Sequence, residues 1–222
     1  MPVSGIIATK EDVEAFRGSC ISLRSLWMHF QILFEGSDLK RELLQTTAPT
    51  FFRDVYGLFG DYLILHICRL TDNAETMGRK NLTVKFLIEH SDFSSAPHTL
   101  EKLSRVSADI HDFRALILPA RNRFISHLDL VAVRLDAPLG AASDAQWKQF
   151  WLDLQDFLDL MHRHYIEPDG HFYLNGMGNM SDADSLLTAL INAKRLLAVM
   201  DDKEIALRAI LASDKSKFAN DI

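Results

Sequence analysis

The amino-acid sequence predicts an all-α protein, an antiparallel helical bundle with four long helices and a C-terminal helical extension. Apolar residues recur at spacings of three and four along most of the 222-residue chain, which is the period of an amphipathic helix. Residue pairs with capping-box spacing precede two of these stretches, and no alternating apolar and polar stretch indicates a strand. These observations favour helices packed against helices.

Local signals place the start of each helix. Thr9 with Asp12 and Ser143 with Gln146 have the spacing of a capping box, in which two side chains satisfy free backbone N–H groups. Pro97 suits the first turn of a helix, where its missing N–H is not needed. In chain order, the helices are predicted to start at Thr9, Asp38, the residues after Pro49, Asn81, Pro97, Ser143, Ser181 and Asp201 or Asp202.

A proline and two loops interrupt the predicted helices. Pro119 lies inside the longest apolar stripe and should bend that helix, because proline lacks the backbone donor and clashes with the preceding turn. Residues 71–80 are polar and predict a loop. Residues 167–180 contain one proline and three glycines with little periodicity, so they predict a loop between a bundle over 1–166 and a helical extension over 181–222.

Net charge, cysteine content and the absence of long apolar stretches bear on what the protein binds and where it is located. The net charge of −6 and the pI near 5.8 argue against a protein that coats nucleic acid non-specifically. Cys20 and Cys68 stand among apolar residues without zinc-site spacing, which predicts buried, unlinked thiols in a reducing compartment. The chain start lacks signal-peptide features, and no stretch reaches the ~18–20 apolar residues of a membrane span. A cytoplasmic protein without a membrane partner is therefore expected.

The polar segment 121–129, RNRFISHLD, ends the longest apolar helix. Arg121 can hold a phosphate through two N–H groups, and His127 can take up or release a proton near neutral pH. A metal-free RNA-cleaving site needs both kinds of side chain. A histidine can transfer the proton that the ribose 2′-OH loses, and an arginine can stabilise the negative charge that builds on the phosphoryl oxygens. On a straight helix the two side chains point about 120° apart. They would converge through the reach of Arg121, through the bend at Pro119, or across two chains.

Arg121-Asn122, followed after four further residues by His127, resembles the R-x4–6-H motif of HEPN domains. The stretch RNRFISHLD is similar to the abortive-infection (AbiU-like) HEPN group. Two upstream features agree with that group, namely residues 66–72, HICRLTD, and the Asn-Leu pair at 81–82. The resemblance covers roughly residues 10–165.

The resemblance implies a homodimeric helical bundle and a metal-independent endoribonuclease of bacterial defence or toxin–antitoxin type, with no cofactor. It would leave 2′,3′-cyclic phosphate and 5′-hydroxyl ends on the RNA substrate, and an antitoxin protein would be a further partner. Some HEPN toxins carry a tyrosine two residues after the histidine, which a nucleotidyltransferase partner modifies, and this chain has Asp129 there. The implied roles are catalysis for Arg121 and His127, support for Asn122, Asp129, Arg69 and Asp72, and RNA binding for Arg123, which shares a helix face with His127.

Other interpretations remain beside this one. A catalytically inactive HEPN module would bind RNA or a nucleotide through the same arginines, and a helical interaction dimer would need neither Arg121 nor His127. In a purely structural interpretation, those two residues bind Asp129 or Asp72, and Arg69 forms an ion pair with Asp72. His162, His164 and His171, with Asp169, lack the i, i+4 spacing of a helical zinc site, so no metal is expected.

Overall fold

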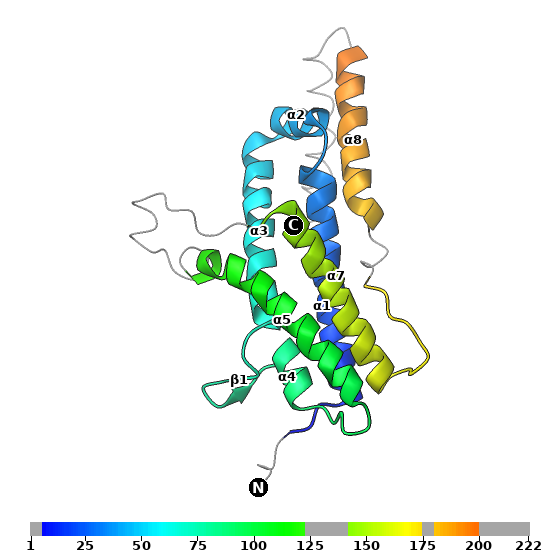
Figure 1. Cartoon of the computed structure of the whole chain (residues 1–222). Helices are drawn as coiled ribbons and strands as arrows, with labels where there is room; N and C mark the ends of the chain where they lie inside the picture. Colours follow the sequence, from blue (N-terminus) through cyan, green and yellow to red (C-terminus); the bar gives the residue numbers. More distant parts are fainter. Residues whose placement is uncertain (1–5, 123–141, 175–179, 200–222) are drawn as a thin grey trace, which may run out of the picture.

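The computed structural model describes residues 6–122, 142–174 and 180–199, and these are almost entirely helical. The prediction of an all-α bundle is confirmed (Figure 1). None of the described helices has an apolar stretch long enough to cross a membrane. The helices are α1 (Lys10–Phe34), α2 (Asp38–Thr47), α3 (Pro49–Leu70), α4 (Val84–Glu89), α5 (Pro97–Ala120), α7 (Asp144–Tyr165) and α8 (Met180–Val199).

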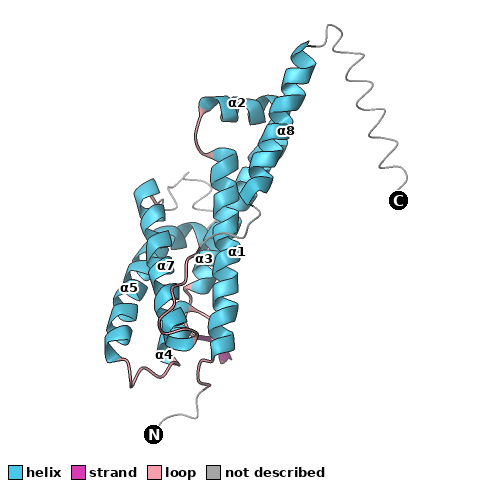
Figure 2. Ribbon diagram, turned by 90° about the vertical axis from the view of Figure 1, so that its right-hand side faces the viewer, coloured by secondary structure: helices cyan, strands magenta, loops and turns pink. Residues whose placement is uncertain are grey.

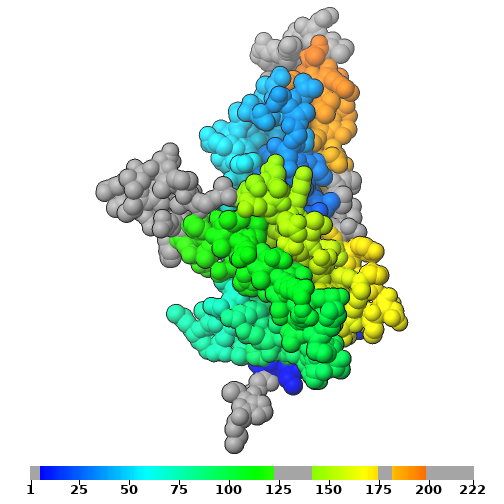
Figure 3. Space-filling model, viewed as in Figure 1, coloured from blue at the N-terminus to red at the C-terminus, as the bar shows by residue number. Residues whose placement is uncertain are grey.

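Four long helices form the main core. Helix α1 packs against α3 and α7, and α5 packs against the same two helices. Figure 3 shows α5 and α7 lying together across one face of the molecule, with α4 beside the lower part of α5. The aromatic side chains of α7 lie mainly in this core, where Phe113 stacks on Phe150 at 4.5 Å and Trp27 stacks on Trp147 at 4.6 Å.

A second, smaller core lies at the far end of the bundle. Helix α8 packs against α1 and α2 there, beside the end of α1 (Figure 2). The helix expected for the C-terminal extension thus adds its apolar side chains to residues from the N-terminal part of the chain. This cluster consists of Leu33, Leu43, Leu44, Phe52, Ala183 and Leu187.

The two predicted capping boxes are present, at Thr9 with Asp12 and at Ser143 with Gln146. The predicted cap at Asn81 is wrong, because Thr83 caps α4 and accepts a hydrogen bond from the backbone N–H of Phe86. Hydroxyl and amide side chains can both cap a helix, so the presence of Asn81 did not by itself decide where α4 begins.

The predicted loop over 71–80 contains a small hairpin of β1 (Glu75–Thr76) and β2 (Arg79–Lys80). Met77 and Gly78 make the turn with φ of 50° and 75°, as in the two-residue turns that join antiparallel strands. Strands of two residues are too short to show an alternating pattern, so they could not be predicted from the sequence.

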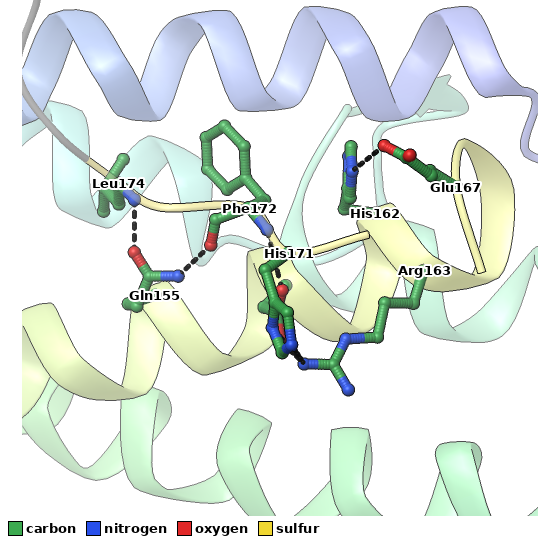
Figure 4. Close-up of polar contacts among 8 residues, drawn as sticks. Gln155, His162, Arg163, Glu167, His171, Phe172 and Leu174 are labelled. Carbon is green, nitrogen blue, oxygen red and sulfur yellow. Dashed lines mark hydrogen bonds and ion pairs between the residues drawn. The ribbon is translucent and has the colours of Figure 1, made fainter. Parts of the chain in front are cut away.

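After α7 the chain runs back along that helix. The side chain of Gln155 donates to the backbone carbonyl of Phe172 and accepts from the N–H of Leu174, and Asp159 accepts from the N–H of Phe172 at 2.8 Å (Figure 4). Residues 167–174 of this segment are irregular, and side chains of α7 bind backbone groups of Phe172 and Leu174.

The prediction for the cysteines is confirmed, because Cys20 and Cys68 are both buried and unlinked. Burial raises the pKa of both thiols. Neither sulfur is therefore a ready nucleophile in the native protein.

Candidate functional site

Arg121 follows the last residue of α5, in a part of the chain where the helix widens. Pro119 lies inside α5, and the backbone N–H of Arg121 donates to the carbonyls of both Ile117 and Leu118. Arg121 and Asn122 continue in a π-helical turn. Such turns are local distortions found often at functional sites, and here the distortion follows a proline that removes one backbone donor.

The side chain of Arg121 is partly buried near the end of α3. Its Nη1 donates to Oδ1 of Asn122 at 2.8 Å. Its Nε is buried and has no hydrogen-bond partner among the described residues. Arg121 also lies close enough to Cys68 for its charge to lower the pKa of that thiol, against the larger effect of burial. The side chain thus lies where the ends of α3 and α5 come together. This region, around Cys68, Asp72, Arg114 and Arg121, is here called the seam.

A partly buried ion pair occupies the same seam. Nη2 of Arg114 donates to Oδ1 of Asp72 at 2.6 Å, and the two side chains are 23 % and 33 % exposed. Arg114 stands seven residues before Arg121, so two helical turns bring both guanidiniums to one face of α5. Both guanidiniums and the carboxylate of Asp72 act on the pKa of the Cys68 thiol, so all three charged groups lie near this part of α3.

The partner of Asp72 is neither Arg69 nor Arg121, two of the partners considered from the sequence. Among the described residues, Asp72 pairs with Arg114, and neither Arg69 nor Arg121 forms an ion pair with it. Arg114 was missed in the sequence because it stands inside a mainly apolar helical stretch. The spacing of seven residues between Arg114 and Arg121 could have indicated that the two share a helix face.

Removing Asp72 is expected to destabilise the fold by about 2 kcal/mol, because Arg114 would keep a partly buried charge beside Arg121 without a carboxylate. In a double-mutant cycle, Asp72→Ala and Arg114→Ala should couple by about 1–2 kcal/mol in the free energy of unfolding measured with urea. The exposed pair of Asp38 and Arg41 on α2 is the control, with coupling of about 0–0.5 kcal/mol. Additive effects at Asp72 and Arg114 would contradict the assignment.

Arg69 lies on a different side of α3, at the edge of an open pocket of about 500 Å³. The pocket lies between α1, the end of α3 and the β1–β2 hairpin. His66 stacks on Tyr62 with ring centroids 4.2 Å apart, and burial, followed by the charge of Arg69, lowers the pKa of His66. The pocket lining includes His66, Arg69, Asp72, Lys80, Asn81 and Leu82.

The predicted site residues are therefore distributed over two neighbouring places. Arg121 and Asn122 lie in the seam with Asp72, and Arg69 lies at the pocket, which Asp72 also lines. Arg123, His127 and Asp129 lie outside the described residues. The approach of His127 to Arg121 thus stays a prediction.

The three histidines considered for a metal have separate partners. His162 contacts Arg17 at 3.2 Å and Glu167 at 3.8 Å, and His164 contacts the carbonyl of Asp92 at 3.0 Å. His171 lies beside Asp159 at 3.5 Å. Within the described ranges, no group of His, Cys, Asp and Glu side chains has an arrangement that could hold a metal ion.

Comparison with known proteins identifies the family. The model of the AbiU2 family, a group of HEPN domains, matches residues 6–177, which is most of the chain and includes both the seam and the segment 121–129. No curated protein and no solved structure was found to match. The range agrees with the resemblance seen in the sequence, which covered roughly residues 10–165. The chain therefore belongs to the AbiU2 family of HEPN domains.

Proposed function

We propose that this chain is a metal-independent endoribonuclease of an abortive-infection system, and that Arg121 and His127 carry the reaction. The observation that supports this most is the placement of Arg121. It stands directly after α5, in the stretch that resembles the HEPN motif, and the nearby carboxylate of Asp72 is already paired with Arg114.

In the proposed reaction the ribose 2′-oxygen attacks the adjacent phosphorus and the bond from phosphorus to the 5′-oxygen breaks. The products are a 2′,3′-cyclic phosphate and a 5′-hydroxyl. The 2′-OH must lose a proton and the leaving 5′-oxygen must gain one, and histidine can perform either transfer near neutral pH. A guanidinium offsets the charge on the two non-bridging oxygens by binding both.

The electrostatics of the seam suit Arg121 to this role. Arg114 binds the carboxylate of Asp72, so that carboxylate is not the partner of Arg121. Within the part of the chain that the structure describes, the guanidinium of Arg121 donates to the neutral amide of Asn122. A neutral partner competes with a phosphate less strongly than a carboxylate would, because hydrogen bonds between two charged groups are the stronger ones.

A homodimer is part of the proposal. Two chains whose 121–129 segments face one cleft would supply two histidines, one as base and one as acid. Phe51, Leu58 and Tyr62 form an exposed apolar stripe along α3, at spacings of seven and four, and the helix continues to Arg69 at the pocket. Exposed large apolar side chains in such a row are typical of an interaction surface. A monomer at micromolar concentration in sedimentation analysis would contradict this part.

Replacing His127 with alanine is expected to abolish RNA cleavage, whereas EDTA should leave cleavage by the wild type intact. The measurement is a cleavage assay on single-stranded RNA in which the product ends are identified. His98→Ala is the matched control, because His98 is an exposed histidine of α5 whose contact is with Glu101 in the same helix. Cleavage by His127→Ala at the wild-type rate, or loss of activity in EDTA, would show that the proposed site is wrong.

A HEPN module that binds RNA or a nucleotide without cleaving it is the second candidate. The open pocket beside Arg69 and His66 favours it, because a cation and an aromatic ring are the usual contacts of a nucleotide. If this candidate is correct, the wild type and His127→Ala both bind RNA or a nucleotide, and neither cleaves RNA.

A further inference from the structure

We propose that the pocket beside Arg69, here called the α3–hairpin pocket, binds one nucleotide of the RNA strand, with Arg69 on its phosphate and His66 against its base. This inference rests on the proposed function, because the occupant is the RNA substrate. It adds a second contact region for the strand, next to the seam that holds Arg121.

The two upstream segments that resemble the family come together at this pocket. His66, Arg69 and Asp72 come from the end of α3, and Asn81 and Leu82 follow the hairpin, yet all five line the same pocket. The pocket also borders the seam, because Asp72 lines the pocket and binds Arg114. A strand in the α3–hairpin pocket would therefore lie next to the place proposed for cleavage.

Among the described residues that line the pocket, Arg69 is the cation left for an anionic ligand. The carboxylate of Asp72 is neutralised by Arg114 at 2.6 Å, and Lys80 is paired with Glu75 at 2.7 Å. Arg69 lies exposed on the last turn of α3 and forms no ion pair with another described residue. An arginine in this setting can bind two phosphate oxygens at once.

The shape and the ring surface suit a base. A volume of about 500 Å³ is within the range of small-ligand pockets. Burial, and after it the charge of Arg69, lowers the pKa of His66, which favours the uncharged form of its ring. Tyr62 already stacks on His66, and a base on His66 would extend that stack, as bases do on aromatic side chains in single-strand binding proteins.

The opposite wall of the pocket is held in place by its own hydrogen bonds. The side chain of Asn81 donates to the carbonyl of Asn73 and to Oγ1 of Thr76, both at 3.0 Å, and its backbone N–H donates to Ala74 at 2.8 Å. These bonds tie the hairpin back to the chain that leaves α3. The pocket is thus formed before any ligand arrives, which reduces the entropy lost on binding.

The test measures binding separately from cleavage. A fluorescent 2′-O-methyl RNA lacks the attacking 2′-OH, so its affinity can be followed by anisotropy whether or not the protein is a nuclease. Arg69→Ala is expected to weaken binding about tenfold and to lower the slope of log K against log salt by about 0.7, the value for one phosphate contact on a single strand. Arg105→Ala is the control, because Arg105 is an exposed arginine of α5 paired with Glu101, and its affinity and slope should match the wild type.

A second readout locates the base. The same RNA with 4-thiouridine, cross-linked by light, is expected to label the α3 segment 62–69, and His66→Ala should reduce the yield. Tight RNA binding that depends on Arg69, in a protein that cleaves nothing, would support the pocket and reject the nuclease. Normal cleavage with unchanged binding by Arg69→Ala and cross-links elsewhere would reject the pocket alone. Tighter, Arg69-dependent binding of free AMP than of RNA would overturn the assignment to a strand.

Discussion

Replacing Arg121 with alanine is expected to slow RNA cleavage by about 30- to 1000-fold, which corresponds to about 2–4 kcal/mol of transition-state stabilisation. The guanidinium would be lost from the point where negative charge builds on the phosphoryl oxygens. Single-turnover cleavage with saturating enzyme is the suitable measurement, because it reports the chemical step without product release.

Two further variants separate charge from geometry at this position. Arg121→Lys keeps the charge and should recover only part of the rate, because an ammonium cannot hold two oxygens in one plane as a guanidinium does. Arg105→Ala removes an exposed arginine from the same helix and should cleave as the wild type does. A rate for Arg121→Ala within a factor of two of the wild type would leave Arg121 with a structural role.

Replacing Leu158 with alanine is expected to lower the free energy of unfolding by about 3 kcal/mol. Leu158 is 1 % exposed on α7, in the core shared by the four long helices. The substitution removes buried methyl groups, so their burial no longer contributes to stability, and it leaves a cavity. Leu152→Ala makes the same change on the same helix, where the side chain is 58 % exposed, and should alter stability by only about 0.5 kcal/mol.

The comparison is made by urea unfolding followed by far-UV circular dichroism, with both variants at the same protein concentration. Equal midpoints for the two leucine variants would mean that α7 is not packed as described. A loss confined to Leu158→Ala would confirm the orientation of α7 in the bundle.

Local features were predictable where a few neighbouring residues decide the structure. Thr9 with Asp12 and Ser143 with Gln146 satisfy the first free N–H groups of their helices within one turn, so their spacing alone indicates the start. The apolar period likewise placed Cys20 and Cys68 in the interior, since residues three and four apart share the face of a helix that must be buried.

The arrangement of the candidate site was only partly predictable. The sequence showed the motif at residues 121–129 and the two upstream segments, at 66–72 and 81–82. It did not show that Arg114 is the partner of Asp72. The two residues are 42 positions apart, and only the packing of α3 against α5 brings their charges to 2.6 Å. Ion pairing depends on the distance between the charges and on their desolvation, and neither can be derived from the spacing of residues in the sequence.

The sequence by itself thus determined the helical class, the helix starts that are set by capping residues, the buried thiols and membership of a HEPN family. Tertiary structure decided which charged residues meet. It placed Arg121 and the pair of Asp72 and Arg114 in one seam, and it placed Arg69 with His66 and Asn81 at a separate pocket. The physical reason is that periodicity specifies which face of a helix is buried, whereas the neighbour of that face depends on how all the helices pack together.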